Sequence, residues 1–231
     1  MSPRHPGLLV LLLLLSVPSV APGQTTAGPS AEEPLRDLFV ALQRYDRAAA
    51  QESLDAVRAL GLEGDEVRLA EAWLLHMDGD HQATLAALDR VTLRDDPMVD
   101  DLRRTAEAAA RWMEGAVELE SAHFRLRFPA GAEEVMAQPA LEVLEAAYRS
   151  VGEDLGLYPE ERVLVEIYPT SAAFAEATGL PASAMANDTI ALCRWDRLLV
   201  TSPMAASFGY PWADTLCHEY THLVVNRLSG G

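Results

Sequence analysis

The 231-residue chain contains no lysine, and all 18 of its basic residues are arginines. Chemistry that depends on lysine is therefore excluded, including Schiff bases, a P-loop lysine and a pyridoxal phosphate anchor. The arginines are also outnumbered, because 35 aspartates and glutamates give a formal net charge of −17. Since nucleic-acid binding requires clustered cations, we expect no nucleic acid among the partners of this protein.

Aromatic residues and cysteines are scarce as well. Only 6% of the chain is aromatic, and the two cysteines are Cys193 and Cys217. Apolar residues make up 49% of the chain, which is enough to bury one or two cores and predicts a globular protein. The two thiols could pair in an oxidising compartment or serve as small buried hydrophobic residues, and the sequence leaves both alternatives open.

The chain has one long apolar run, from Leu8 to Leu15, which follows Arg4 and precedes the small residues of Ala21-Pro22-Gly23. This pattern predicts a signal peptide over 1–23, cleaved near Gln24. An uncleaved anchor is the alternative, but the run is shorter than the roughly 20 residues that span a bilayer. We expect an exported protein, periplasmic or extracellular, with no stable membrane insertion after cleavage. The Gly, Thr, Ala and Pro residues of 24–31 predict a disordered leader.

Residues 32–115 show helical periodicity throughout, as at Leu54, Val57 and Leu60. A turn at Asp78-Gly79-Asp80 joins two such segments, which predicts an antiparallel helical hairpin of the kind found in solenoids. Within it, residues resemble a tetratricopeptide repeat at Ala72, Leu75, Gly79-Asp80, Leu88, Val91 and Pro97. A plain helical bundle explains the same periodicity equally well. Either arrangement offers a surface for a protein partner.

Two histidines, His76 and His81, flank this turn together with Asp78 and Asp80. Their spacing matches no known arrangement of metal ligands. We therefore interpret both histidines as surface residues of the turn.

After residue 115 the pattern changes to strands that alternate irregularly with helices. Strands are expected at His123–Phe128, Arg162–Tyr168, Thr189–Cys193 and Leu198–Thr201, and helices at Val135–Leu155 and from Thr170 or Ser171 to Ala177. This order predicts an α+β domain over 118–231, preceded by the all-helical region of 32–115.

The last predicted helix follows Pro211 and contains the HExxH motif His218-Glu219-Tyr220-Thr221-His222. Histidines four residues apart on a helix are separated by about 40° around the axis and about 6 Å along it, so both rings can reach one metal ion. Glu219 lies beside them, where it can accept a proton from a bound water. Asp214 lies one turn earlier and either orients the His218 ring or complements the helix dipole.

Around this motif, four segments together resemble the peptidase MA-like, or gluzincin, metallopeptidase domains of exported bacterial proteins. They are HFRLRFP, VEIYPTSAAFAEATGLP, TIALCRWDRLLVTSP and GYPWADTLCHEYTH. The resemblance covers 118–231 and implies a zincin-like fold that hydrolyses peptide or protein substrates. It further implies that His218 and His222 bind Zn²⁺ and that Glu219 is the general base. The strand before the motif would form the sheet edge where a peptide docks, at Leu198, Leu199, Val200 and Thr201.

A catalytic zinc ion usually has three protein ligands and a water, and the third protein ligand is missing here. Residues 223–231 contain no His, Cys, Asp or Glu, and Val225 and Leu228 stand where a metzincin needs Gly and His. By the same resemblance, a gluzincin takes its third ligand from a Glu on a later helix. We therefore expect the domain to be truncated at its C-terminus, and this chain to bind zinc weakly and to be nearly inactive.

A second hypothesis uses the same observations. The protein could be an exported helical-repeat interaction protein whose motif-bearing half is an inert remnant of a zincin. A structural zinc domain is disfavoured, because such sites normally close with four ligands, often cysteines.

Overall fold

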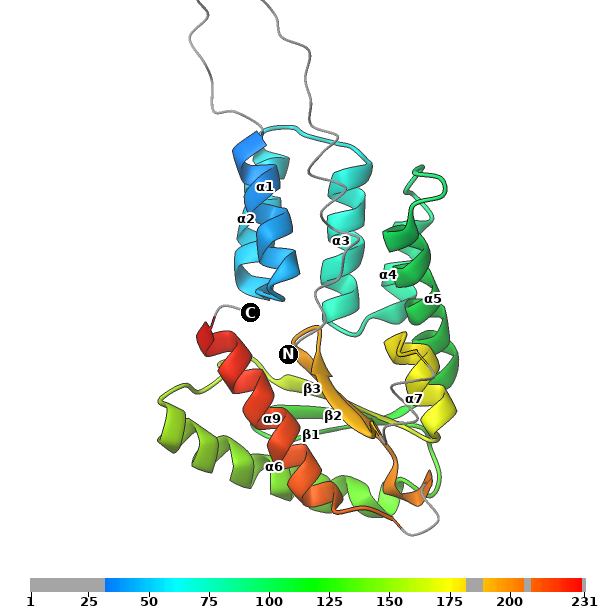
Figure 1. The fold of residues 1–231 in the computed structure, drawn as a ribbon, viewed down its shortest axis with the longest axis vertical. Coiled ribbons are helices and arrows are strands. Elements are labelled where there is room, and N and C mark those ends of the chain that lie inside the picture. The colour runs from blue at the N-terminus through cyan, green and yellow to red at the C-terminus, as the bar shows by residue number, and fades with distance from the viewer. Residues whose placement is uncertain (1–31, 182–188, 206–208, 230–231) are drawn as a thin grey trace, which may run out of the picture.

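The computed structural model describes residues 32–181, 189–205 and 209–229. The predicted signal peptide (1–23) and leader (24–31) lie outside the described residues. Within the described part, the chain forms a five-stranded mixed sheet with helices on both sides (Figure 1), which confirms the α+β class. None of the described helices combines the length and the apolar character needed to cross a membrane.

The first half is helical, as predicted. Its helices are α1 (Glu32–Gln43), α2 (Arg47–Ala59), α3 (Asp65–Met77), α4 (His81–Leu88) and α5 (Pro97–Trp112). Three of them begin at an aspartate, Asp46, Asp80 or Asp96, whose side chain accepts a hydrogen bond from a backbone N–H of the first turn. These caps explain why the helices start where they do, and Pro97 fixes the first turn of α5.

The second half contains the five strands of the sheet and the helices α6, α7 and α9. Its elements are β1 (Val117–Glu120), β2 (Phe124–Phe128), α6 (Glu134–Leu155), β3 (Val163–Tyr168), α7 (Ser171–Thr178), β4 (Ala191–Arg194), β5 (Arg197–Thr201), the short 3₁₀ turn η2 (Pro203–Ala205) and α9 (Trp212–Ser229). The predicted elements agree with these bounds to within about two residues. Strand β1, with four residues whose side chains are mostly exposed, was not predicted from the sequence.

The strand order is β1-β2-β3-β5-β4. The central strands β2, β3 and β5 are parallel, whereas β1 and β4 pair antiparallel at the two ends. The expectation that Leu198–Thr201 forms an edge is therefore wrong, because β5 lies between β3 and β4. The outer strand on this side is β4, and β5 is buried along its whole length.

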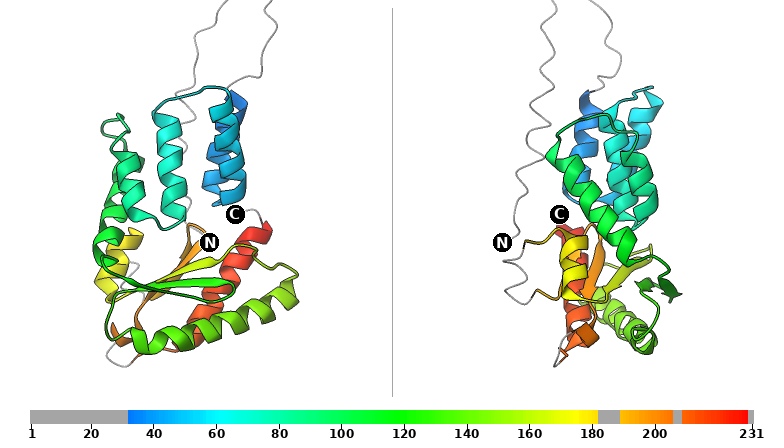
Figure 2. Two further views of the ribbon diagram at one scale, coloured as in Figure 1. Left: turned by 180° about the vertical axis from the view of Figure 1, so that it is seen from behind. Right: turned by 90° about the vertical axis from the view of Figure 1, so that its right-hand side faces the viewer.

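Helices cover both faces of the sheet (Figure 2). On one face, α6 and α9 pack against apolar residues of β2, β3 and β5. On the other face lies the helical layer, which we define as α1–α5 together with α7. One hydrophobic cluster runs from α1 and α2 through this layer to Tyr168, Trp195 and Leu199 of the sheet region. The predicted division between 32–115 and 118–231 falls between α5 and β1, and this shared core crosses it.

Candidate metal centre

Helix α9 carries the motif, which has residues on both its buried and its solvent-facing side. Its buried face consists of Leu216, Glu219, Tyr220, Leu223 and Val224, which pack towards the sheet and α6. His218 and His222 lie on the opposite side and are exposed. The predicted helix is thus confirmed, and it presents both imidazoles to solvent.

The two rings point towards each other. Their Nε2 atoms are 2.9 Å apart, and the ring planes are nearly perpendicular, at 88°. Two Zn–N bonds of about 2.0–2.1 Å at the tetrahedral angle place their nitrogens about 3.3 Å apart, so a small rotation of the rings would open the observed gap to this distance. The ring nitrogens of His218 and His222 therefore fit a shared metal ion.

Glu219 differs from its neighbours because it is buried, with 8% of its surface exposed. Burial raises the pKa of Glu219, against the opposing influence of His222, His218 and a hydrogen bond from the backbone of Cys193. A carboxylate with a raised pKa is a stronger proton acceptor. The environment of Glu219 therefore suits a general base.

A hollow of about 510 Å³ lies beside the motif, between α9 and the start of β4. Its lining comes from Thr189, Ile190, Ala191, Asp214, Thr215, His218 and Glu219. The outer strand of the sheet and the motif side chains thus face the same space. Asp214 shares this hollow with His218, and its role as an orienting partner of that ring stays a prediction.

A complete metal site would need further ligands. Within 32–181, 189–205 and 209–229, no three His, Cys, Asp or Glu side chains are grouped so that they could hold a metal ion. Cys193 and Cys217 are both free thiols. Burial raises the pKa of the Cys193 thiol to about 12, which keeps it protonated at neutral pH. The candidate centre is therefore a two-histidine arrangement.

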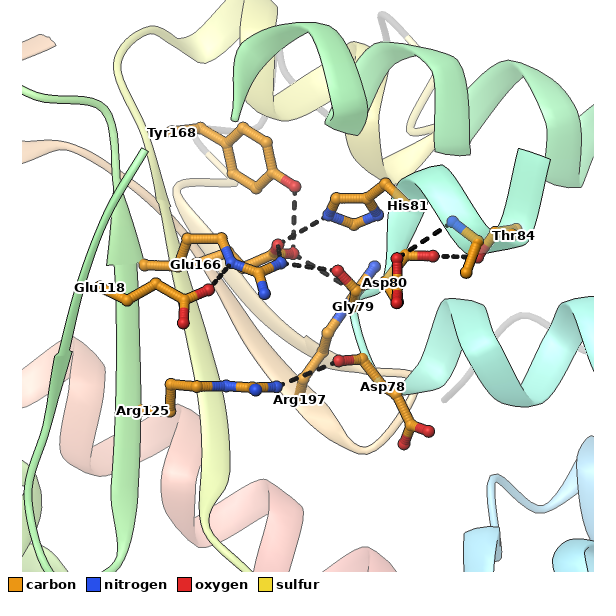
Figure 3. Close-up of polar contacts among 12 residues, drawn as sticks. Asp78, Gly79, Asp80, His81, Thr84, Glu118, Arg125, Glu166, Tyr168 and Arg197 are labelled. Atoms are coloured by element: carbon orange, nitrogen blue, oxygen red, sulfur yellow. Dashed lines mark hydrogen bonds and ion pairs between the residues drawn. The ribbon is translucent and has the colours of Figure 1, made fainter. Parts of the chain in front are cut away.

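The opposite face of the sheet holds a second polar cluster, which the sequence analysis missed. The interpretation of His76 and His81 as surface residues is wrong, because they are 0% and 5% exposed. Figure 3 shows His81 pointing at Glu166 of β3, with 2.8 Å between His81 Nε2 and Glu166 Oε1. The Tyr168 hydroxyl donates to Glu166 Oε2 over 3.2 Å.

Two arginines complete this Glu166 network. Nη1 of Arg127 lies 3.1 Å from Glu166 Oε1, and Nη1 of Arg197 lies 3.5 Å from Oε2. Burial on its own would raise the pKa of Glu166, yet Arg197, His81 and Arg127 hold that pKa far below its ordinary range. Glu166 is therefore ionised, and His81 Nε2 carries the proton of their hydrogen bond.

The same cluster binds the turn between α3 and α4 through its backbone. Arg125 donates to the carbonyl of Asp78 over 3.2 Å, and Arg127 donates to the carbonyl of Gly79 over 2.6 Å. Gly79 has a φ of +72°, and a Cβ there would collide with the side chain of Leu164. One feature of the sequence could have revealed the Glu166 network. Glu166 interrupts the otherwise apolar strand VLVEIY, and a charged residue buried within a strand requires partners of opposite charge.

A larger hollow of about 1240 Å³ lies beside the turn and is lined by arginines and acidic residues alike. Some of its charges pair with one another. Arg47 binds Asp78, and Arg162 Nη1 lies 3.2 Å from Glu120 Oε2. No known arrangement of catalytic residues is recognisable in its lining, so the HExxH motif is the stronger candidate for chemistry.

Comparison with known proteins adds no assignment to this geometry. No family model, no curated protein and no solved structure matches the chain. The functional interpretation therefore depends on the chemistry of the residues around α9.

Proposed function

We propose that the protein is a zinc-dependent peptidase in which His218 and His222 bind the metal and Glu219 is the general base. The observation that carries this proposal is the 2.9 Å separation of the two Nε2 atoms beside a buried carboxylate on the same helix. Two histidines and a glutamate in this arrangement are the ligand pair and base of metal-assisted hydrolysis.

Each group has a defined task. Zinc held by the two rings would polarise a carbonyl oxygen and lower the pKa of a bound water. Glu219 accepts a proton from the attacking water and later delivers it to the leaving amine. Both rings must be unprotonated to bind the metal, so the zinc affinity falls as the pH is lowered.

The substrate side of the proposal involves β4 in place of β5. Because β4 is the terminal strand of the sheet, an extended peptide can add to its outer edge through backbone hydrogen bonds. The hollow next to Ala191 and Glu219 lies along this path. The docking strand is thus Ala191–Arg194, which replaces the Leu198–Thr201 strand expected from the sequence.

The zincin-like identity of the domain is part of the proposal. A catalytic zinc ion takes three protein ligands, and the two histidines supply two of them. The export of the protein through its predicted signal peptide belongs to the same proposal.

The decisive experiment compares wild-type protein with Glu219→Gln, each loaded with zinc. Peptide-library cleavage is measured by mass spectrometry. We expect the variant to be slower by about 10²- to 10⁴-fold, because it cannot accept the proton. Glu153→Gln, an exposed change on α6, is the matched control and should cleave at the wild-type rate. Equal rates for wild type and Glu219→Gln would refute the proposal.

The alternative function is an exported interaction protein with an inert zincin remnant. The absence of a three-ligand group among the described residues favours it, as does the helical layer as a partner surface. Calorimetric titration of the chain with Zn²⁺ separates the two functions. Binding that is lost in His222→Ala supports the peptidase, whereas no binding at millimolar Zn²⁺ supports the remnant.

A further inference from the structure

The turn between β4 and β5 has an unusual backbone. Trp195 and Asp196, the two residues of the turn, have φ values of +56° and +58°. Residues other than glycine rarely adopt this conformation, and it persists only where the surroundings hold the side chains in place. Both side chains are indeed held, each by a different part of the molecule.

Asp196 is held by α9. Arg227 Nε donates to Oδ1 of Asp196 over 2.8 Å, and Nη2 donates to Oδ2 over 2.7 Å. The side chains are 17% and 27% exposed, for Asp196 and Arg227 respectively. A two-pronged, half-buried pair of this kind is stronger and more directional than an exposed ion pair.

Trp195 is held by the helical layer. It is 2% exposed and meets the ring of His76 edge-on, with 4.3 Å between the centroids. The guanidinium of Arg194 lies over the Trp195 ring, 4.4 Å from its centroid. The tip of the hairpin is thus fixed between α3 and α9.

The Asp196–Arg227 pair lies in line with the proposed base. Glu219, Leu223 and Arg227 are spaced four residues apart, so they share one stripe of α9. At one end of this stripe, Glu219 receives a hydrogen bond from the backbone of Cys193 in β4. At the other end, Arg227 binds the turn that follows β4. The strand is also joined to the helix by apolar packing and by the contact of the Asn226 amide with Cys193 Sγ at 3.9 Å. Among its polar contacts with α9, the ion pair is the strongest.

We propose that Asp196 and Arg227 are positioning residues of the peptidase: their ion pair fixes β4 against α9 so that the outer edge of β4 and Glu219 face the same substrate. This inference rests on the proposed function and adds to it the means by which base and docking strand are aligned. Neither residue touches the substrate or the metal. Misalignment of a bound substrate by about 1 Å can slow catalysis by about 10²-fold.

The test uses the full chain and three variants: Asp196→Asn, the charge reversal Asp196→Arg with Arg227→Asp, and Asp89→Asn. The last removes an exposed pair in the helical layer, in which Arg103 Nη1 lies 2.8 Å from Asp89 Oδ1, and serves as the control. Hydrogen exchange of the amides of 191–194 reports on β4. Absorption spectra of the Co²⁺-substituted protein report on the two-histidine site, and circular dichroism confirms folding.

For Asp196→Asn we expect amide exchange in β4 to be at least tenfold faster, while the Co²⁺ dissociation constant stays within twofold of wild type. In the zinc-loaded protein, kcat for a peptide should fall at least tenfold and KM should change by less than threefold. The charge reversal should restore exchange to within threefold of wild type, and Asp89→Asn should have no effect.

Unchanged β4 exchange in Asp196→Asn, or a charge reversal that restores nothing, would overturn the inference. So would a variant that loses Co²⁺ affinity and β4 protection together, because the pair would then only support the fold of α9. If wild-type protein binds no Co²⁺, the proposed function fails instead. The exchange results need no metal and are read separately, so the two failures are distinguishable.

Discussion

The two faces of the sheet carry two clusters of ionisable side chains that are opposite in character. Under the helical layer, Glu166 is fully buried and is surrounded by His81, Arg127, Arg197 and the Tyr168 hydroxyl. On α9, the His218 and His222 rings are exposed and their Nε2 atoms face each other at 2.9 Å. The Glu166 carboxylate is paired within the protein, although the buried guanidinium nitrogens of Arg197 make no hydrogen bond, whereas the two histidines of α9 are open to solvent.

This difference separates structure from chemistry. Buried charges must be paired, so the Glu166 network is explained by the need to join two layers without leaving an orphaned ion. No packing requirement brings two exposed imidazoles together. The two Nε2 atoms lie within hydrogen-bond distance of each other, and the proposal that they share a metal ion is the reason for placing the candidate site on α9 although the Glu166 network is the larger cluster.

The largest expected effect concerns the Glu166 network. Glu166→Leu removes the carboxylate and leaves the buried Arg197 without its counter-ion, so the free energy of unfolding should fall by about 3–5 kcal/mol. Urea denaturation followed by circular dichroism measures this change. Adding Arg197→Leu to the variant should recover part of the loss. A single variant that loses under 1 kcal/mol would show that the network does not join the layers.

His81→Ala should have the next largest effect. It removes a buried hydrogen bond to an ionised carboxylate, which is worth about 1.5–3 kcal/mol of unfolding free energy. Gln82→Ala, an exposed change next to it on α4, should stay within about 0.5 kcal/mol of wild type. Equal losses in these two variants, measured by urea denaturation, would contradict the buried role of His81.

The pH dependence of stability should come partly from His76. Burial, reinforced by Arg197 and His81, holds the pKa of His76 far below its ordinary value, so the folded chain resists protonation there. The unfolded chain binds this proton below about pH 6.5, and the unfolding free energy should therefore fall by up to about 1.4 kcal/mol per pH unit as the pH decreases. His76→Leu should lose this slope between pH 6.5 and 5. Parallel curves for the two proteins would refute the assignment.

The smallest effect on stability should come from the candidate metal centre. Because His222 is exposed, His222→Ala should change the unfolding free energy of the metal-free chain by no more than about 0.5 kcal/mol. The same variant should lose Zn²⁺ binding in calorimetric titration. A large loss of unfolding free energy with unchanged Zn²⁺ affinity would show that His222 is a structural residue. The α9 side of the sheet would then carry structural side chains, as the Glu166 side does.

Local patterns predicted the helices and the motif well. Helices depend on local signals, namely the aspartate caps, the proline at the start of α5 and the spacing of apolar residues. Each of these acts over a few neighbouring residues, so it can be recognised from the sequence alone. The same holds for His218, Glu219 and His222, whose juxtaposition depends only on one turn of helix. Identity of the metal and activity stay predictions.

Features that depend on layers packing together were missed. His76 and His81 lie beside a polar turn, and their burial follows only from the docking of α3 and α4 on β2 and β3. The short strand β1 has few buried side chains to mark it. The inner position of β5 was misjudged, although its continuous run RLLVT is typical of a strand covered on both faces, whereas a docking edge is expected to be more polar.

The turn at Gly79 has a consequence for how this protein tolerates mutation. Here the helical layer meets the sheet through main-chain carbonyl oxygens, which Arg125 and Arg127 recognise whatever side chains flank them. Substitution at Asp80 would alter the cap of α4 and leave this recognition in place. A side chain at position 79 would meet the end of the Leu164 side chain and would have to adopt a φ of +72°, so substitution there should strain the contact between the two halves of the protein.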